Sequence, residues 1–376
     1  MVQLSHSEIT ALWQKEKRRR RKQLTVAIAL LIMTFLASLC FRTVIPGFIP
    51  KEAFLNSVMA LRLLYAQLTH SSFVFEKITI QNEMPYYLET IARFKISVIT
   101  VFSGMALALS GAVFQTAYRN PLASPNMIGA TAGVNLGNVY MVYAYSTACL
   151  NMIVYRYVVC YLFTIVIMGF IILFSRFTGL KGYAYSVVEM VMVGSVISHI
   201  ISTFVTFRMY RMNTNDLATY QLLNMGAYIS SSTAVILIFL VLSIGGMIPL
   251  LKMRFRINSL GISQEEAAAG GIRPWTEQVL AQGFGIIIIT AALVQCGDIG
   301  LFALAVPHIV RYFTGSDFRR LAVDSCVAGG ILLLICRSIS SMFFVSVYGA
   351  PISFIIALLM LPVFIVIIIQ QRRGFE

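Results

Sequence analysis

Residues 93–116 read RFKISVITVFSGMALALSGAVFQT, in which Arg93 and Lys95 precede a long stretch without a charge. A helix of this length can cross the hydrocarbon core of a bilayer, which is about 30 Å thick. Similar apolar stretches recur along the chain, so the sequence predicts an all-α, polytopic membrane protein. The ten predicted spans are residues 24–41, 93–116, 125–146, 156–175, 185–207, 232–251, 276–295, 299–313, 320–341 and 352–370.

The composition excludes most classes of soluble protein. Of the 376 residues, 58% are apolar and 12% are charged, whereas soluble domains carry about 25% charged residues. The net charge of +14 comes from cations at the ends of the apolar stretches, above all the run from Lys15 to Lys22. This placement follows the positive-inside rule of membrane proteins and does not indicate a nucleic-acid partner.

The same cations orient the chain. With the N-terminus inside, the cytoplasmic side carries 19 Lys and Arg and the outer side carries 10. Ten spans then put both termini in the cytoplasm. We expect a basic N-terminal tail over residues 1–23 and one transmembrane domain over 24–376, interrupted by an outer loop, 42–92, and a cytoplasmic loop, 252–275. Long loops in a compact protein are usually functional.

Small residues predict close helix packing in the second and third spans. The stretch from Ser103 to Ala112 has small residues on much of its surface, and Gly129, Gly133 and Gly137 form two GxxxG steps. Small residues let helices approach closely in lipid, where packing drives their association.

The segment between these two spans predicts a sharp reversal of the chain. Asn120 is followed by Pro121, which cannot continue the preceding helix. Ser124 and Pro125 then read as the N-cap and the first-turn proline of the next helix.

The cytoplasmic loop contains a predicted short helix. Ser263 and Glu266 make a capping box at its start, and Gly270 or Gly271 supplies a left-handed residue at its end. A helix this short is not stable alone. It must pack on the protein's own surface or on a partner subunit, and we favour a partner.

Two histidines lie in predicted spans. His308 follows Pro307 in a short span that ends at Arg311, and it serves either proton transfer or, as we favour, a structural hydrogen bond. His199 lies nearer the middle of the bilayer, where an ionisable group is a candidate for the transport pathway. The alternative for His199 is a neutral imidazole bonded to a neighbouring helix.

The sequence lacks the motifs expected of a protein that binds a nucleotide, couples transport to an ion or holds a metal. The sequence has no Gly-x-x-x-x-Gly-Lys-Ser/Thr loop for ATP, no carboxylate pair within a span for ion coupling, and no CxxC pair among its six cysteines. We predict no catalytic residue, no resident cofactor and no metal site, so a transporter of this kind takes its energy from another subunit. The alternatives are an ion-coupled transporter acting alone and an intramembrane enzyme that uses Ser195 and His199.

These motifs, in this order, resemble the membrane permease subunits of type II ABC importers, the FecCD-type family for iron–siderophore complexes, haem and vitamin B12. The family's small-residue helix, NPLA turn and glycine-rich helix are matched by Gly104 to Gly137. Its LG-x-x-x-A-x-x-(L)G pattern is matched by Leu260 to Gly271. Its long motif ending in PH-I-x-R is matched by Gly297 to Arg311, with Gly300 inside it.

The resemblance implies an assembly in a bacterial cell membrane. The assembly contains a second permease subunit, either a copy or a paralogue, two cytoplasmic ATP-binding subunits and an extracytoplasmic substrate-binding protein. The family's ATPase-coupling segment maps onto Gly261, Ser263, Glu265, Glu266, Ala267, Ala268, Gly270 and Gly271.

The outer surface departs from the family pattern. The family's R-L-P-R sequence, whose arginines face acidic residues of the binding protein, here reads Arg93-Phe94-Lys95-Ile96. Met342 stands where the family has an arginine before the last span. We expect Arg337 to take the place of that arginine. We therefore expect Arg93, Lys95 and Arg337 to dock the binding protein. The expected cargo is an iron(III)–siderophore complex, with haem or cobalamin as alternatives.

Overall fold

The computed structural model describes residues 6–40, 84–145, 152–178, 187–226, 233–262, 264–343 and 352–373, and within them no strand occurs. The α-helices are α1 (His6–Cys40), α4 (Met84–Ala117), α5 (Ala130–Tyr145), α6 (Met152–Thr178), α7 (Val187–Tyr210), α8 (Thr214–Asn224), α9 (Thr233–Lys252), α10 (Arg254–Leu260), α11 (Gln264–Ala269), α12 (Pro274–Cys296), α13 (Gly300–Thr314), α14 (Phe318–Phe343) and α15 (Ile352–Arg373). Each predicted span overlaps one of these helices, and the all-α fold is confirmed. Residues 42–83 of the predicted outer loop and Ser263 lie outside the described residues.

The predicted spans differ in length. Seven described helices are long and apolar enough to cross a membrane, namely α1, α4, α6, α7, α9, α12 and α14. The helices α13 and α15 contribute shorter apolar segments. The third predicted span is not one helix, because a 3-10 turn, η1 (Pro125–Ile128), precedes the 16 residues of α5. At 1.5 Å per residue, 16 residues reach only about 24 Å.

The core of the bundle forms around α4. This helix packs against α9, α12, α13 and α14. Gly104 of α4 and Gly329 of α14 lie so close that a Cβ on either would collide with the carbonyl oxygen of the other. The glycines thus let the two backbones meet, as the small-residue pattern predicts.

The glycine stripe of α5 faces α6. A Cβ on Gly133 would lie 2.6 Å from the Cα of Thr164, and one on Gly137 would lie 2.7 Å from the Cα of Cys160. The glycines thus let the backbones of α5 and α6 pack in direct contact.

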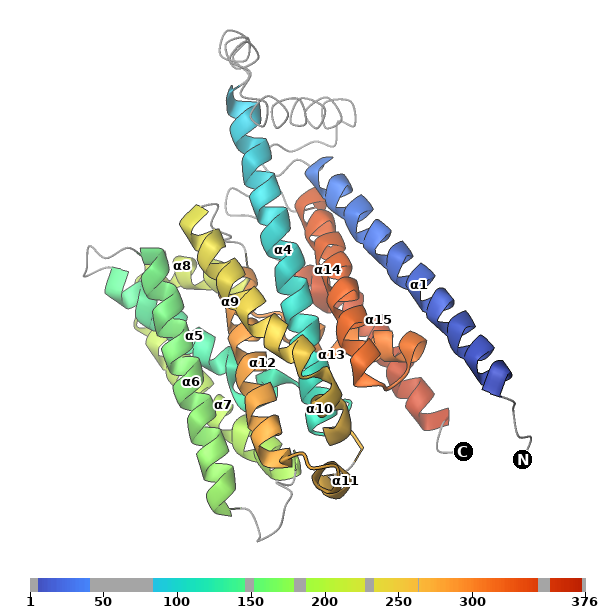
Figure 1. Cartoon of the computed structure of the whole chain (residues 1–376). Coiled ribbons are helices and arrows are strands. Elements are labelled where there is room, and N and C mark those ends of the chain that lie inside the picture. The colour runs from blue at the N-terminus through green and yellow to red at the C-terminus, as the bar shows by residue number, and fades with distance from the viewer. Residues whose placement is uncertain are drawn as a thin grey trace.

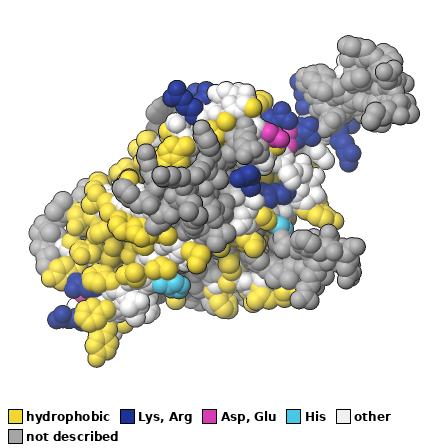
Figure 2. Space-filling view, turned by 90° about the horizontal axis from the view of Figure 1, so that it is seen from below, with side chains coloured by type: hydrophobic (Ala, Val, Ile, Leu, Met, Phe, Trp, Pro, Cys, Tyr) yellow, Lys and Arg dark blue, Asp and Glu magenta, His cyan; other side chains and the backbone are white. Residues whose placement is uncertain are grey.

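Apolar side chains also cover the outside of the bundle. On α1, at one edge of the bundle in Figure 1, Val26, Ile32 and Met33 are exposed, and on α6 so are Leu162 and Val166. Seen from the end that bears α11, hydrophobic side chains gather along one flank, whereas Lys and Arg side chains lie in separate groups (Figure 2). An apolar flank of this kind suits contact with lipid or with another membrane subunit.

The two ends of the bundle differ. The start of α1, the end of α15 and the short helix α11 lie at one end, and α8 lies toward the other (Figure 1). The sequence analysis did not predict α8. Its N-cap is Asn213, whose side chain accepts a hydrogen bond from the Asp216 N–H at 2.8 Å.

Candidate functional site

Two short helices, α10 and α11, join the long helices α9 and α12 (Figure 1). A left-handed turn ends α11: Gly271 has a φ of +77°, and its N–H donates to the Ala268 carbonyl at 3.0 Å. The Ile272 N–H donates to the Ala267 carbonyl, also at 3.0 Å. These two bonds define a Schellman turn. Of the two predicted stop residues, Gly271 is therefore the left-handed one.

The α11 helix touches the rest of the protein along one edge. Ala267 is only 2% exposed, and α11 contacts α10 and α12. Glu266, Ala268, Ala269 and Gly270 are exposed, whereas the side chains of Gln264 and Glu265 are not among those described. The helix thus docks on its own chain by a small buried side chain and presents an open face beyond it.

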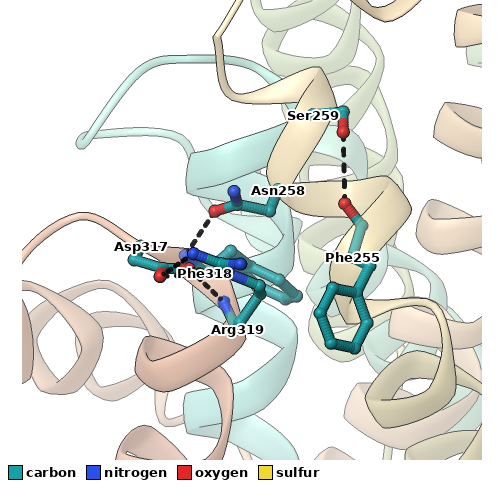
Figure 3. Close-up of polar contacts among 6 residues, drawn as sticks. All are labelled: Phe255, Asn258, Ser259, Asp317, Phe318 and Arg319. Atoms are coloured by element: carbon teal, nitrogen blue, oxygen red, sulfur yellow. Dashed lines mark hydrogen bonds and ion pairs between the residues drawn. The ribbon is translucent and has the colours of Figure 1, made fainter. Parts of the chain in front are cut away.

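The Asn258 side chain ties α10 to α14 (Figure 3). Its Oδ1 accepts a hydrogen bond from the backbone N–H of Phe318 at 2.8 Å. Phe318 is the first residue of α14 and is fully buried. The first N–H groups of a helix have no acceptor within the helix, so Asn258 supplies one from a distant part of the sequence.

An ion pair completes the start of α14. The Arg319 Nη2 lies 2.7 Å from the Asp317 Oδ2, and the Arg319 N–H donates to the Asp317 Oδ1 at 3.0 Å. The same guanidinium lies 5.9 Å from the centre of the Phe255 ring on α10. The Arg319 guanidinium holds the pKa of the Asp317 carboxyl below its ordinary value of 3.8, because a hydrogen-bonded cation favours the charged carboxylate.

A second contact ties α10 to α12. The Arg256 Nη1 lies 2.9 Å from the Glu277 Oε1, and the Glu277 side chain is 12% exposed. Beyond the end of α10, Gly261 packs against Thr116 of α4. The α10 helix is therefore bonded to the starts of two long helices, α12 and α14, and abuts α4.

The α13 helix is joined to α4 around its proline. Pro307 has no N–H to offer the Ala303 carbonyl, and Gly111 of α4 packs directly on that carbonyl. Nearby, the Gln115 Nε2 donates to the Leu304 carbonyl at 2.9 Å, and the Arg311 Nη2 donates to the Gln115 Oε1 at 3.2 Å.

The predicted reversal after α4 is present. Arg119 has a φ of +51°, and the Asn120 N–H donates to the Gln115 carbonyl at 3.1 Å. The Asn120 Oδ1 then accepts from the Leu122 N–H at 2.9 Å, across Pro121. Ser124 caps η1, and Gly129, with a φ of +84°, ends it.

The three cations predicted to dock the binding protein differ in exposure. Arg93 is 4% exposed, and its Nη1 donates to the Leu39 carbonyl of α1 at 3.3 Å. The Lys95 Nζ donates to the Thr233 Oγ1 at 3.0 Å, and Arg337 is half-buried on α14. Arg93 therefore joins α1 to α4 in this structure, and the docking role of all three stays a prediction.

The two histidines lie in different environments. His308 is half-buried on α13, one turn before Arg311, and His199 is exposed on α7. His199 lines neither of the two cavities described next. The roles predicted for both histidines stay predictions.

Two cavities, of about 580 and 450 Å³, share Asp298 and Ser353 in their walls. Both volumes lie in the range of about 300–1,000 Å³ that is usual for small-molecule sites. Their walls combine apolar side chains with hydroxyl and amide groups. The polar residues of the larger cavity include Asn135, Ser202, Thr206, Gln221 and Asn224, and those of the smaller include Ser124, Asn126 and Thr131.

A buried polar network supports the wall near Asp298. The Arg156 Nε donates to the Asn138 Oδ1 at 3.0 Å, and the Asn138 Nδ2 donates to the Asn224 Oδ1 at 2.9 Å. The Asn224 carbonyl in turn accepts from the Asp298 N–H at 2.9 Å. Sequence reasoning missed this network. The only signals were an asparagine inside a predicted span and an arginine at the start of the next one.

The sequence profile of the FecCD transport family matches residues 30–370. This match covers most of the chain, which therefore belongs to the FecCD transport family. It is the permease of an ABC importer, a class whose ATPase activity lies on separate subunits.

Three relatives differ in the cargo for which they are named. The chain is 25% identical to the iron-uptake system permease protein FeuB of Bacillus subtilis over 73% of this chain and 78% of that protein. It is 28% identical to the molybdate import system permease protein MolB of Haemophilus influenzae over 72% and 77%. It is 26% identical to the hemin transport system permease protein HmuU of Yersinia pestis over 78% and 87%.

The fold also matches a solved structure. This structure, described as an inward-facing conformation of a metal-chelate type ABC transporter, superposes with a TM-score of 0.72. The match covers 93% of this chain and 98% of that chain at 22% identity. The family assignment excludes the two alternatives of an ion-coupled transporter acting alone and an intramembrane enzyme. The cargo remains open among the relatives.

Proposed function

We propose that this chain carries an iron(III)–siderophore complex into a bacterial cell as one of two permease subunits. Two ATP-binding subunits would sit beneath the bundle and a substrate-binding protein would dock at the other end, with both termini of this chain in the cytoplasm. Haem and cobalamin are the alternative cargoes. The observation that carries the proposal is the open face of α11, tied by α10 to the long helices.

The mechanism follows from these ties. An ATP-binding subunit that grips α11 through Glu266 and Ala268 would displace α10 when it closes on ATP. The bond from Asn258 to Phe318 and the ion pair between Arg256 and Glu277 would pass this motion to α14 and α12. Packed helices shift as rigid elements, so the cavities would open to one side of the membrane at a time.

The cargo assignment rests on relatives and on the cavity walls. Relatives named for iron uptake and for hemin transport have about the same identity to this chain. Walls of hydroxyl, amide and apolar groups suit a bulky complex that must bind weakly enough to leave again.

Charge reversal on α11 tests the proposal. In proteoliposomes that contain the whole transporter, the double variant Glu265→Arg, Glu266→Arg is expected to lower ATP-driven uptake of a ferric siderophore at least about tenfold, because like charges oppose docking. Capture of the cargo by the binding protein should not change. The control is Arg19→Glu, which reverses an exposed charge on α1 at the edge of the bundle. Uptake by the double variant at the rate of this control would contradict the coupling role.

A further inference from the structure

Helix α1 is longer than a membrane span and carries a dense run of cations at one end of its apolar part. The helix has 35 residues. Its uncharged part, residues 24–40, is about 26 Å long at 1.5 Å per residue, which is close to the thickness of the hydrocarbon core, about 30 Å. With this part in the core, residues 18–22 lie in the headgroup layer, which is about 5–8 Å thick on each side.

One side of α1 packs on the bundle. The Leu31 side chain packs on α14, and the Ser38 Oγ lies 3.0 Å from the Ser97 Oγ on α4. Within the basic run, Arg20 is half-buried and interacts electrostatically with Asp324 of α14. These contacts define the side of α1 that faces the protein.

The opposite side, the outward face of α1, points away from the bundle (Figure 1). Arg18, Arg21 and Lys22 are exposed and share this face, because residues three and four apart are neighbours on a helix. The same face continues through Ile32 and Leu36, which are 56% and 52% exposed. Cations at the membrane boundary and apolar side chains beside the core match the two parts of a phospholipid.

The charge of the run favours one kind of phospholipid. Residues 15–22, KEKRRRRK, contain seven cations and one carboxylate, so the run stays strongly positive whatever that carboxylate binds. Clusters of Lys and Arg next to a membrane helix are attracted to anionic lipids, and guanidinium groups bind phosphate oxygens in pairs. A zwitterionic lipid carries its own cation, which cancels most of this attraction.

We infer that the outward face of α1 is a binding site for an anionic phospholipid. Arg18, Arg21 and Lys22 hold the phosphate and the net negative charge of the headgroup, and Ile32 and Leu36 contact the acyl chains. The positive-inside rule decides the side of the membrane on which a basic run lies, whereas this face also selects the lipid that borders it. The site is independent of the cargo.

A photo-reactive amino acid in place of Thr25 provides the test, because Thr25 is exposed and lies one turn after Arg21 on the same face. The assembled transporter is placed in vesicles with equal amounts of phosphatidylglycerol and phosphatidylcholine of the same acyl chains, and mass spectrometry identifies the lipid in each adduct. Adducts at Thr25 should contain at least about three times more phosphatidylglycerol than phosphatidylcholine. The same group in place of Leu162, on the exposed apolar face of α6, should capture both lipids about equally.

Removal of the three cations should reduce this preference. The triple variant Arg18→Gln, Arg21→Gln, Lys22→Gln should lower the ratio at Thr25 at least about twofold. The matched control, which should leave the ratio unchanged, removes three exposed cations elsewhere in the chain: Arg211→Gln, Lys252→Gln and Arg273→Gln.

The basic run also orients the chain, so a second measurement keeps the run intact. The unaltered protein is compared at about 0.05 M and about 0.5 M salt, and screening should lower the ratio at Thr25 at the higher concentration.

Equal capture of the two lipids at Thr25 of the otherwise unaltered protein would overturn the inference. So would a ratio that is the same in the triple variant and its control, a ratio that salt does not change, or adducts at Thr25 with a protein chain in place of lipid. These measurements need no cargo. The proposed function would fail separately, if the complete transporter with its binding protein imported no ferric chelate in the presence of ATP.

Discussion

A single side chain, Asn258, joins the loop that bears α11 to the start of α14. Replacing it with alanine leaves the buried Phe318 N–H without this acceptor, which costs about 1–3 kcal/mol of stability. We expect Asn258→Ala to keep most ATPase activity but to transport less cargo per ATP, because α14 no longer follows α10. The measurement is the ratio of uptake to ATP hydrolysis in proteoliposomes.

Two further variants separate coupling from folding. Asn258→Asp places a carboxylate oxygen where the amide oxygen accepts the bond and should restore the ratio. Ser259→Ala removes only an exposed hydroxyl that bonds to the Phe255 carbonyl at 3.3 Å and should behave as the unaltered protein. If Asn258→Ala transports as much cargo per ATP as Ser259→Ala, the bond does not transmit motion.

Asp317 makes stability depend on pH at the acid end. Its pKa is lower in the folded protein than the ordinary value of 3.8 because of Arg319. A lowered pKa stabilises the fold above the unfolded value, and this stabilisation is lost as the pH falls through the folded value. Solvent screening limits the contribution to about 0.5–1 kcal/mol. Comparing thermal unfolding at pH 6 and pH 3 should show a smaller loss for Asp317→Asn than for the unaltered protein, and equal losses would refute this.

At the scale of elements, the contact between α4 and α14 depends on glycine. A Cβ at Gly104 has no room beside Gly329, so Gly104→Ala should lower stability by about 1–3 kcal/mol through overpacking. Gly245→Ala on α9 is the matched control, because nothing lies within 4 Å of its Cβ position. It should be neutral or slightly stabilising through helix propensity. The midpoint of thermal unfolding in detergent distinguishes them, and equal midpoints would show that the close approach is dispensable.

Hydropathy and capping residues were enough to predict most elements. The ten apolar stretches became helices because length and apolarity define a span. The turn around Pro121 and the stop at Gly271 followed from residues that favour those conformations. The sequence analysis missed α8 because the helix is short and polar, although Asn213 followed by Asp216 is a recognisable N-terminal signal.

The candidate site was harder to predict than the fold. The exposed face of α11 followed from a local pattern, whereas the bond from Asn258 to Phe318 joins residues far apart in the sequence. The wall around Asp298 is made of residues from α5, α7, α8, α13 and α15. The residue pattern within one helix cannot predict which other helices will lie beside it. The contact of Arg93 with the Leu39 carbonyl of α1 likewise joins residues far apart in the sequence, and the docking role of Arg93 stays a prediction.

At the scale of the whole molecule, the structure places two features along the bundle. One end offers α11, and the wall formed by several helices holds the two cavities that share Asp298. The contacts of α10 with α12 and α14 connect α11 to the cavity wall, because α12 ends at Cys296, two residues before Asp298. An importer of this design needs no nucleotide site of its own.

The most direct test of this coupling is site-specific crosslinking in the assembled transporter. A photo-reactive amino acid in place of Ala268, on the open face of α11, should form a covalent product with the ATP-binding subunit, in a yield that changes when ATP is added. The same group in place of Leu162, on the exposed apolar face of α6, should give no such product. Products of Ala268 with lipid or with this chain alone would contradict the claim that α11 receives the motion of the ATPase.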